Sequence, residues 1–173
     1  MPLHLSRDNP TWTLKNKIQE VSQSFLNAHG FSYFQYLRCY VDGSIGLLTN
    51  DTRLIEFFPQ MENEPVVFSS FEEEHERSHA YWFLWDEELP EAPVSLAREQ
   101  FHIHNGLTLV RRSKEYYDMI AVALPKEQEN AGSFYLNKMK AIENFIHEFD
   151  RDNKDFIHDM KKIQLHCLKH IAM

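Results

Sequence analysis

One short segment of the chain matches a pattern that binds zinc in many enzymes. His75-Glu76-Arg77-Ser78-His79 fits HExxH, in which two histidines one helical turn apart hold the metal and the glutamate acts as a base. Such a helix needs a buried apolar face to hold its ligands, and the surrounding SSFEEEHERSHA has none. A chain with 10 histidines also meets this pattern by chance. We therefore expect no metal and no other cofactor.

Other patterns of catalytic residues are missing from the sequence. With only 5 glycines there is no glycine-rich phosphate loop, and Gly-x-Ser-x-Gly is absent as well. Neither Cys39 nor Cys167 has a histidine in a recognisable catalytic context. We predict that the protein is not an enzyme. The alternative, that it is an enzyme, is supported only by residues 75–79.

The aromatic residues are more informative, because aromatic walls are common in small-molecule pockets. Those able to line a cavity between a sheet and its helices are Phe57, Phe58, Tyr81, Trp82, Phe83, Trp85, and either Tyr33 or Tyr36. The tips of tryptophan and tyrosine need a hydrogen-bonding partner when buried, and a ligand carbonyl is one candidate. The alternative is that these tips bond backbone carbonyls in a filled core, and the sequence leaves both open.

The clearest local structure lies between Phe31 and Asn50. Two runs of aromatic and branched residues flank Asp42-Gly43, which supplies the positive φ angles of a tight hairpin turn. We predict an antiparallel hairpin of Phe31–Tyr40 with Ser44–Thr49. The first arm carries apolar residues on both faces, so both faces of the sheet should be covered. This favours an α/β fold of the α/β/α sandwich type.

The remaining elements follow from periodicity and turn signals. We predict helices at 11–29, 53–58, 94–104 and from Ser133 onward, and further strands at 81–85, 107–111 and 117–124. Asn105-Gly106 should end the third helix, and the polar RDNKD at 151–155 interrupts the last. The run YDMIAVAL is nearly all apolar and should be the central strand. The result is a five-stranded, mainly antiparallel sheet with the element order of a PAS- or GAF-like sensor.

Length and charge limit the domain organisation and the partners. The 173 residues fit one sensor domain at 11–150, preceded by a tail at 1–10 and followed by a C-terminal helix at 151–173. A net charge of −8 without a basic cluster argues against direct nucleic-acid binding. No signal peptide or membrane-spanning run is visible, and the two cysteines suggest no disulfide framework. We expect a cytoplasmic protein that does not associate with membranes.

The last helix carries an apolar stripe that continues past the expected domain. Its members are Phe156, Met160, Ile163, Cys167 and Ile171. A stripe with no partner inside the domain must be buried elsewhere. We therefore predict a homodimer.

Several short motifs follow one another in an informative order. These motifs are Gly30-Phe31-Ser32-Tyr33-Phe34, Leu54-Ile55-Glu56-Phe57-Phe58, Glu64-Pro65-Val66-Val67, Trp85, and Phe101-His102-Ile103-His104-Asn105-Gly106-Leu107-Thr108. Their order resembles that in the N-terminal autoinducer-binding domain of LuxR-type transcription regulators. Together they cover about residues 12 to 150. The resemblance implies a PAS-like fold and a small apolar or amphipathic ligand, as in bacterial quorum sensing. It also implies ligand contacts from Tyr33, Tyr36, Leu54, Phe58, Glu64, Trp85 and Thr108.

The chain departs from the family pattern at several of these positions. Where the family's lactone-binding members place Trp, Tyr and Asp, this sequence has Leu54, Phe58 and Glu64, which reduces polar contacts to a lactone head group. Trp85 matches, and we expect it to donate a hydrogen bond to the ligand. Residues 151–173 hold one helix and no helix-turn-helix module. The leading hypothesis is thus a sensor domain that signals through dimerisation, and the alternative is a ligand-free dimerisation or decoy module with a filled core.

Overall fold

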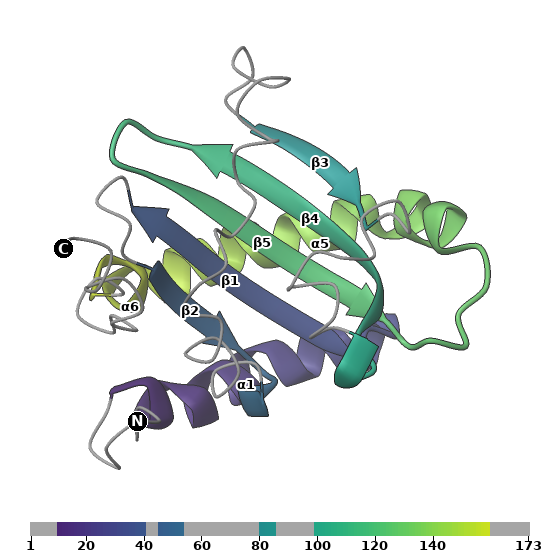
Figure 1. Ribbon diagram of the computed structural model, residues 1–173, viewed down its shortest axis with the longest axis horizontal. Coiled ribbons are helices and arrows are strands. Elements are labelled where there is room, and N and C mark those ends of the chain that lie inside the picture. Colours follow the sequence, from purple (N-terminus) through teal and green to yellow (C-terminus); the bar gives the residue numbers. More distant parts are fainter. Residues whose placement is uncertain (1–9, 41–44, 54–79, 86–98, 160–173) are drawn as a thin grey trace, which may run out of the picture.

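Five strands form a single antiparallel sheet in the computed structural model, which describes residues 10–40, 45–53, 80–85 and 99–159 (Figure 1). The strands are β1 Tyr33–Tyr40, β2 Ile45–Thr49, β3 Ala80–Leu84, β4 His104–Arg112 and β5 Tyr116–Leu124. Their order in the sheet is β2-β1-β5-β4-β3, and all neighbours are antiparallel. The central place predicted for YDMIAVAL is confirmed, since β5 lies between β1 and β4. The predicted five-stranded α/β fold is confirmed as well.

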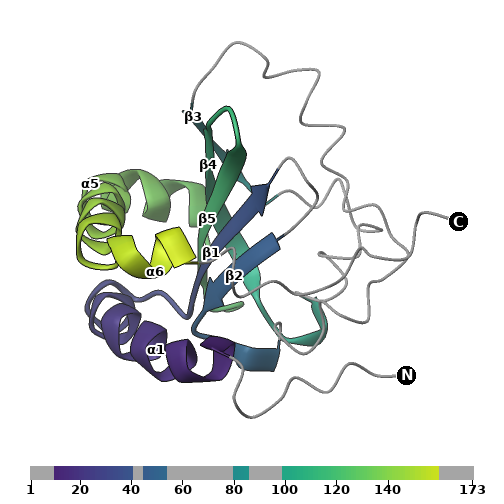
Figure 2. The same ribbon diagram turned by 90° about the vertical axis from the view of Figure 1, so that its left-hand side faces the viewer.

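The described helices all lie against one face of this sheet, as Figure 2 shows from the side. They are α1 Pro10–His29, α5 Ala131–Asp152 and α6 Lys154–Asp159. Aromatic rings fill the space between them and the sheet. Phe25 of α1 stacks on Phe145 of α5 with centroids 4.0 Å apart, and Phe34 of β1 meets Phe149 edge to face at 4.9 Å. This layer is the main hydrophobic core.

The other face of the sheet is also buried. Tyr33, Leu37 and Leu47 on that face are each exposed by less than 5%. The predicted burial of both faces is therefore confirmed. The helices predicted at 53–58 and 94–104 lie largely outside the described residues.

The predicted hairpin is confirmed in its pairing and differs in its register. β1 pairs antiparallel with β2, with Cys39 opposite Ile45 and Arg38 opposite Gly46. A regular two-residue turn across Asp42-Gly43 would instead place Cys39 opposite Gly46. The observed register is therefore shifted by one residue from the register that the predicted turn requires. The turn itself lies outside the described residues.

The predicted helix end at Asn105-Gly106 is wrong, because both residues belong to β4. The register slips between His104 and Gly106, which leaves Asn105 as the extra residue of a bulge with φ 50°. Asparagine tolerates this left-handed backbone, so the same residue serves a bulge as readily as a helix C-cap. The turn at Phe101-His102 precedes the strand, so no helix reaches residue 104.

The predicted interruption within 151–155 is confirmed at Asn153, which separates α5 from α6. The side-chain amide and the backbone N–H of Asn153 both donate to the carbonyl of Phe149, at 3.0 and 2.9 Å. The carbonyl of Asn153 then accepts from the N–H of Ile157 at 3.0 Å. Asn153 is 1% exposed and Ile157 belongs to the main core, so α6 packs on the domain.

The beginning of the predicted dimer stripe is thus engaged within the chain. The ring of Phe156 packs on the core cluster, and the ammonium group of Lys17 lies 3.8 Å from its centroid. Met160, Ile163, Cys167 and Ile171 lie outside the described residues.

The aromatic core predicts a large cost for truncating Phe149, which is 2% exposed and contacts Phe34, Tyr36 and Phe145. We expect Phe149→Ala to lower the free energy of unfolding by about 3–5 kcal/mol in urea denaturation. Leu136→Ala on the same helix is the control, because Leu136 is 77% exposed and should change stability by less than about 0.5 kcal/mol. Equal losses in the two variants would contradict this account of the core.

Candidate functional site

Trp85, the residue after β3, lies flat over the neighbouring strand. Its backbone N–H donates to the carbonyl of Gly106 at 2.8 Å, and its indole Nε1–H donates to Oγ1 of Thr108 at 2.7 Å. A Cβ atom at position 106 would overlap the indole ring. Glycine at this position is therefore what lets the indole approach β4 closely.

Tyr33 of β1 lies beside this tryptophan on the same face of the sheet. The two rings meet edge to face with centroids 6.3 Å apart, and the Tyr33 hydroxyl donates to Oε1 of Gln35 at 2.6 Å. Tyr33 and Thr108 are 2% and 1% exposed. Three of the seven predicted ligand contacts, Tyr33, Trp85 and Thr108, are thus brought together.

A small apolar cluster surrounds these three residues. Tyr33 packs in it with Ile103 and Ala123, and the rings of Trp85 and Phe101 border it. Gln35, which the sequence reasoning missed, adds a buried polar group at 4% exposure. The sequence feature that could have indicated Gln35 is its position two residues after Tyr33, which puts both side chains on the same face of a strand.

The hydrogen-bonding role predicted for Trp85 differs from what the structure shows. Its indole N–H, expected to donate to a ligand, donates to Thr108 within the chain. The Tyr33 hydroxyl is likewise paired, with Gln35. Within the described part of this face, the tips of both aromatic residues are satisfied by neighbouring side chains.

Several other predicted residues lie outside the described ranges. Leu54, Phe58 and Glu64 are among them, as is the HExxH segment at 75–79. Within the described part of the chain, no group of three or more His, Cys, Asp or Glu side chains is placed to hold a metal ion. In the same part, no helix has the length and apolar character needed to cross a membrane.

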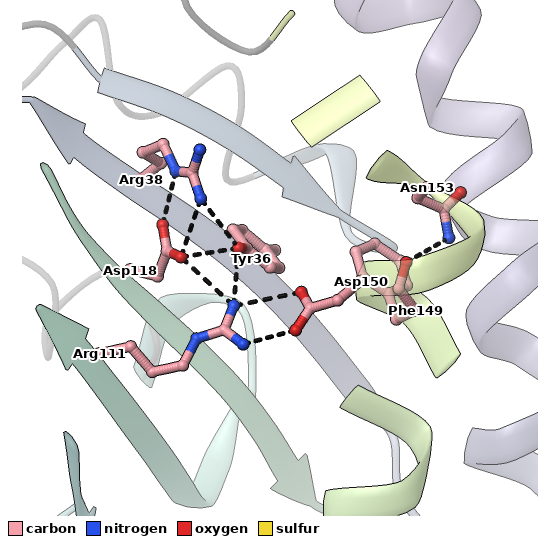
Figure 3. Close-up of polar contacts among 7 residues, drawn as sticks. All are labelled: Tyr36, Arg38, Arg111, Asp118, Phe149, Asp150 and Asn153. Carbon is pink, nitrogen blue, oxygen red and sulfur yellow. Dashed lines mark hydrogen bonds and ion pairs between the residues drawn. The ribbon is translucent and has the colours of Figure 1, made fainter. Parts of the chain in front are cut away.

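Of the two tyrosines predicted for this site, Tyr33 lies on the Trp85 face and Tyr36 does not. The side chains of a strand alternate, so Tyr36 points to the helix side, where its ring lies 5.8 Å from that of Phe149. There its hydroxyl donates to Oδ2 of Asp118 at 2.7 Å (Figure 3). Burial first, and then the Asp118 carboxylate, raise the pKa of Tyr36 above its ordinary value, so the hydroxyl stays protonated and remains a donor.

Asp118 is the centre of a polar cluster that the sequence reasoning missed. The register places it opposite Arg38 of β1 on one side and Arg111 of β4 on the other. Arg38 donates to both carboxylate oxygens, at 2.6 and 2.9 Å, and Arg111 donates to Oδ2 at 3.3 Å. Arg111 also pairs with Asp150 of α5, with Nη2 and Oδ1 3.1 Å apart. The signal in the sequence was a single acidic residue inside an apolar strand.

Two comparisons with solved structures are informative about the fold. The chain superposes on Escherichia coli SdiA with a TM-score of 0.51 and 12% identity, over 79% of this chain and 61% of SdiA. It superposes on CepR2 from Burkholderia cenocepacia, an N-acylhomoserine lactone dependent LuxR family transcription factor, with a TM-score of 0.53 and 11% identity. That match covers 81% of this chain and 93% of CepR2.

These similarities confirm the predicted resemblance to LuxR-type proteins at the level of the fold. No protein-family model and no curated protein sequence matches the chain. The chain spans about three fifths of the length of SdiA.

The close contact of Trp85 with Gly106 predicts that Gly106→Ala is destabilising. The added methyl group overlaps the indole ring, and overpacking of this kind costs about 1–3 kcal/mol. Gly132→Ala is the matched control, because a Cβ there meets only Leu84 Cδ1 at 3.9 Å. Thermal unfolding should separate the two variants, and a Gly106→Ala protein as stable as Gly132→Ala would refute the described packing of Trp85.

The Asp118 cluster predicts that Asp118→Ala is strongly destabilising. Removing the carboxylate, which is 3% exposed, leaves the buried guanidinium of Arg38 without its ion pair, at a cost of about 3–5 kcal/mol. Asp152→Ala provides the comparison, because its ion pair with Arg151 is largely exposed and contributes little. Urea denaturation of both variants measures the difference, and a small effect at Asp118 would show that the cluster is not a stabilising centre.

Proposed function

We propose that the chain is the small-molecule-sensing domain of a LuxR-type transcription regulator. The observation that carries this proposal is the fold it shares with CepR2, a lactone-dependent transcription factor, over 93% of the CepR2 chain in the solved structure. CepR2 is a transcription factor, which supports a regulatory role and not an enzymatic one. The proposed ligand is small and apolar or amphipathic.

The proposed binding site is the sheet face that holds Tyr33, Trp85 and Thr108. Aromatic and aliphatic side chains gather there, which suits an apolar ligand. Because the Trp85 indole donates to Thr108 and the Tyr33 hydroxyl to Gln35, recognition by these residues would rest on apolar contact. Leu54, Phe58 and Glu64 complete the proposed set of contacts.

Signalling through a homodimer in the cytoplasm belongs to the same proposal. It is supported by the apolar stripe that the sequence continues from Met160 to Ile171. Burial of that stripe against a second copy would couple the sensor to its output. We also propose that the domain is PAS-like, which the strand order β2-β1-β5-β4-β3 supports.

A second candidate function is a ligand-free dimerisation or decoy module with a filled core. The pairing of both polar tips within the Trp85 face favours it, because a filled core satisfies its polar groups internally. Native mass spectrometry of freshly purified protein separates the two candidates. A retained small molecule supports the sensor, whereas a ligand-free dimer that no N-acylhomoserine lactone stabilises supports the module.

The sensor proposal predicts different effects on ligand binding for substitutions of Trp82, which lies in β3, and of Trp85, which follows β3. Trp85 faces the proposed site, whereas Trp82 packs against the core on the helix side. Trp85→Phe removes the hydrogen bond to Thr108 and reshapes the site, so we expect at least tenfold weaker binding of the retained molecule. Trp82→Phe should bind it as the unchanged protein does. Binding is measured by titration into extracted, ligand-free protein, and unchanged affinity in Trp85→Phe would place the ligand elsewhere.

A further inference from the structure

The helix side of the sheet carries a separate cleft of about 300 Å³, at the end where α5 meets α6. Its walls come from β1, β4 and β5 on one side and from Asp150, Lys154 and Ile157 on the other. Ile157 is the one aliphatic residue among the described lining residues. The cleft therefore differs from the Trp85 face both in position and in chemistry, and it does not suit an apolar ligand.

Among the described residues that line this cleft, positive charge exceeds negative charge. Arg38, Arg111 and Lys154 line it, against the two carboxylates of Asp118 and Asp150. Both carboxylates are engaged by the two arginines, as Figure 3 shows. Arg112 also borders the cleft, but the alternation along β4 directs its side chain to the opposite face, so it is left out of this balance.

Two cationic groups keep donors that the cluster does not use. Arg38 is 8% exposed and donates through Nε and Nη2, while its Nη1 bonds no group among the described residues. The guanidinium carbon lies 3.6 Å from the centroid of Tyr116, which holds the group in place. Lys154 is exposed and forms no ion pair within the described ranges.

We propose that this cleft binds a small oxyanion, a phosphate or carboxylate group, between Arg38 and Lys154. A guanidinium edge held rigid by Asp118 and Tyr116 is preorganised for an oxyanion, and charge-assisted bonds of this kind are strong. The two carboxylates balance the charges of Arg38 and Arg111, so Lys154 supplies the net positive charge for the anion. Ser113 also lines the cleft, and a serine hydroxyl can donate to a further oxygen of the anion.

The test is isothermal titration of the unmodified protein with inorganic phosphate and, separately, with malonate, at an ionic strength fixed with sodium chloride. We expect saturable binding of at least one anion. Phosphate binding without malonate binding identifies a phosphate site, and the reverse identifies a carboxylate site. Absence of saturable binding of both anions overturns the proposal.

Two variants with the same change of charge localise the binding. Lys154→Glu should weaken it at least tenfold, whereas Lys140→Glu should leave it unchanged, because Lys140 is exposed on α5 and does not line the cleft. Equal binding by both variants overturns the assignment to this cleft. Neither variant touches the Trp85 face, so the outcome is independent of the proposed sensing function.

Discussion

The buried carboxylate of Asp118 constrains the three central strands of the sheet, β1, β5 and β4. An ionised carboxylate removed from water costs several kcal/mol unless it is paired and hydrogen-bonded, and Asp118 is 3% exposed. Its partners, Arg38 and Arg111, stand opposite it on the two neighbouring strands. A slip of one residue in β5 would turn Asp118 to the other face and leave both arginines without it. Arg111 also forms an ion pair with Asp150, so the same arginine side chain links α5 to the sheet.

The alternation of side chains then gives the two faces of the sheet separate roles. One face packs against the helices through apolar side chains that include Phe34, and it carries the Asp118 cluster at one end. The other face holds Tyr33, Trp85 and Thr108. β4 carries parts of both, since Thr108 and Arg111 are three residues apart on opposite faces. If a ligand bound at Thr108 displaced β4, the Arg111–Asp150 ion pair would carry that displacement to α5. On the proposed function, this strand connects the ligand site to α5.

Local patterns in the sequence were enough to predict most of the described elements. The alternating aromatic residues of β1, the apolar run of β5 and the helical spacing of α1 each depend on neighbours in sequence. Asn105 shows where such reasoning fails, because a residue that tolerates positive φ fits a bulge and a helix end equally well. The choice between them is made by pairing with β5, a contact distant in sequence. The side of the sheet on which Tyr36 lies, and the partners of Asp118, likewise depend on the register of several strands.

The candidate site illustrates the same limit for a single residue. Motif order and the aromatic residues predict Trp85 as a site residue, and the structure places it beside Tyr33 and Thr108. Its hydrogen bond could not be predicted in this way, because it depends on which residue of β4 stands opposite. Leu84 pairs with Leu107, so Trp85 lies across from Gly106, and the missing side chain there lets the indole reach Thr108. A tryptophan in the same motif beside a larger residue would be held away from β4, and its N–H would be left for a ligand.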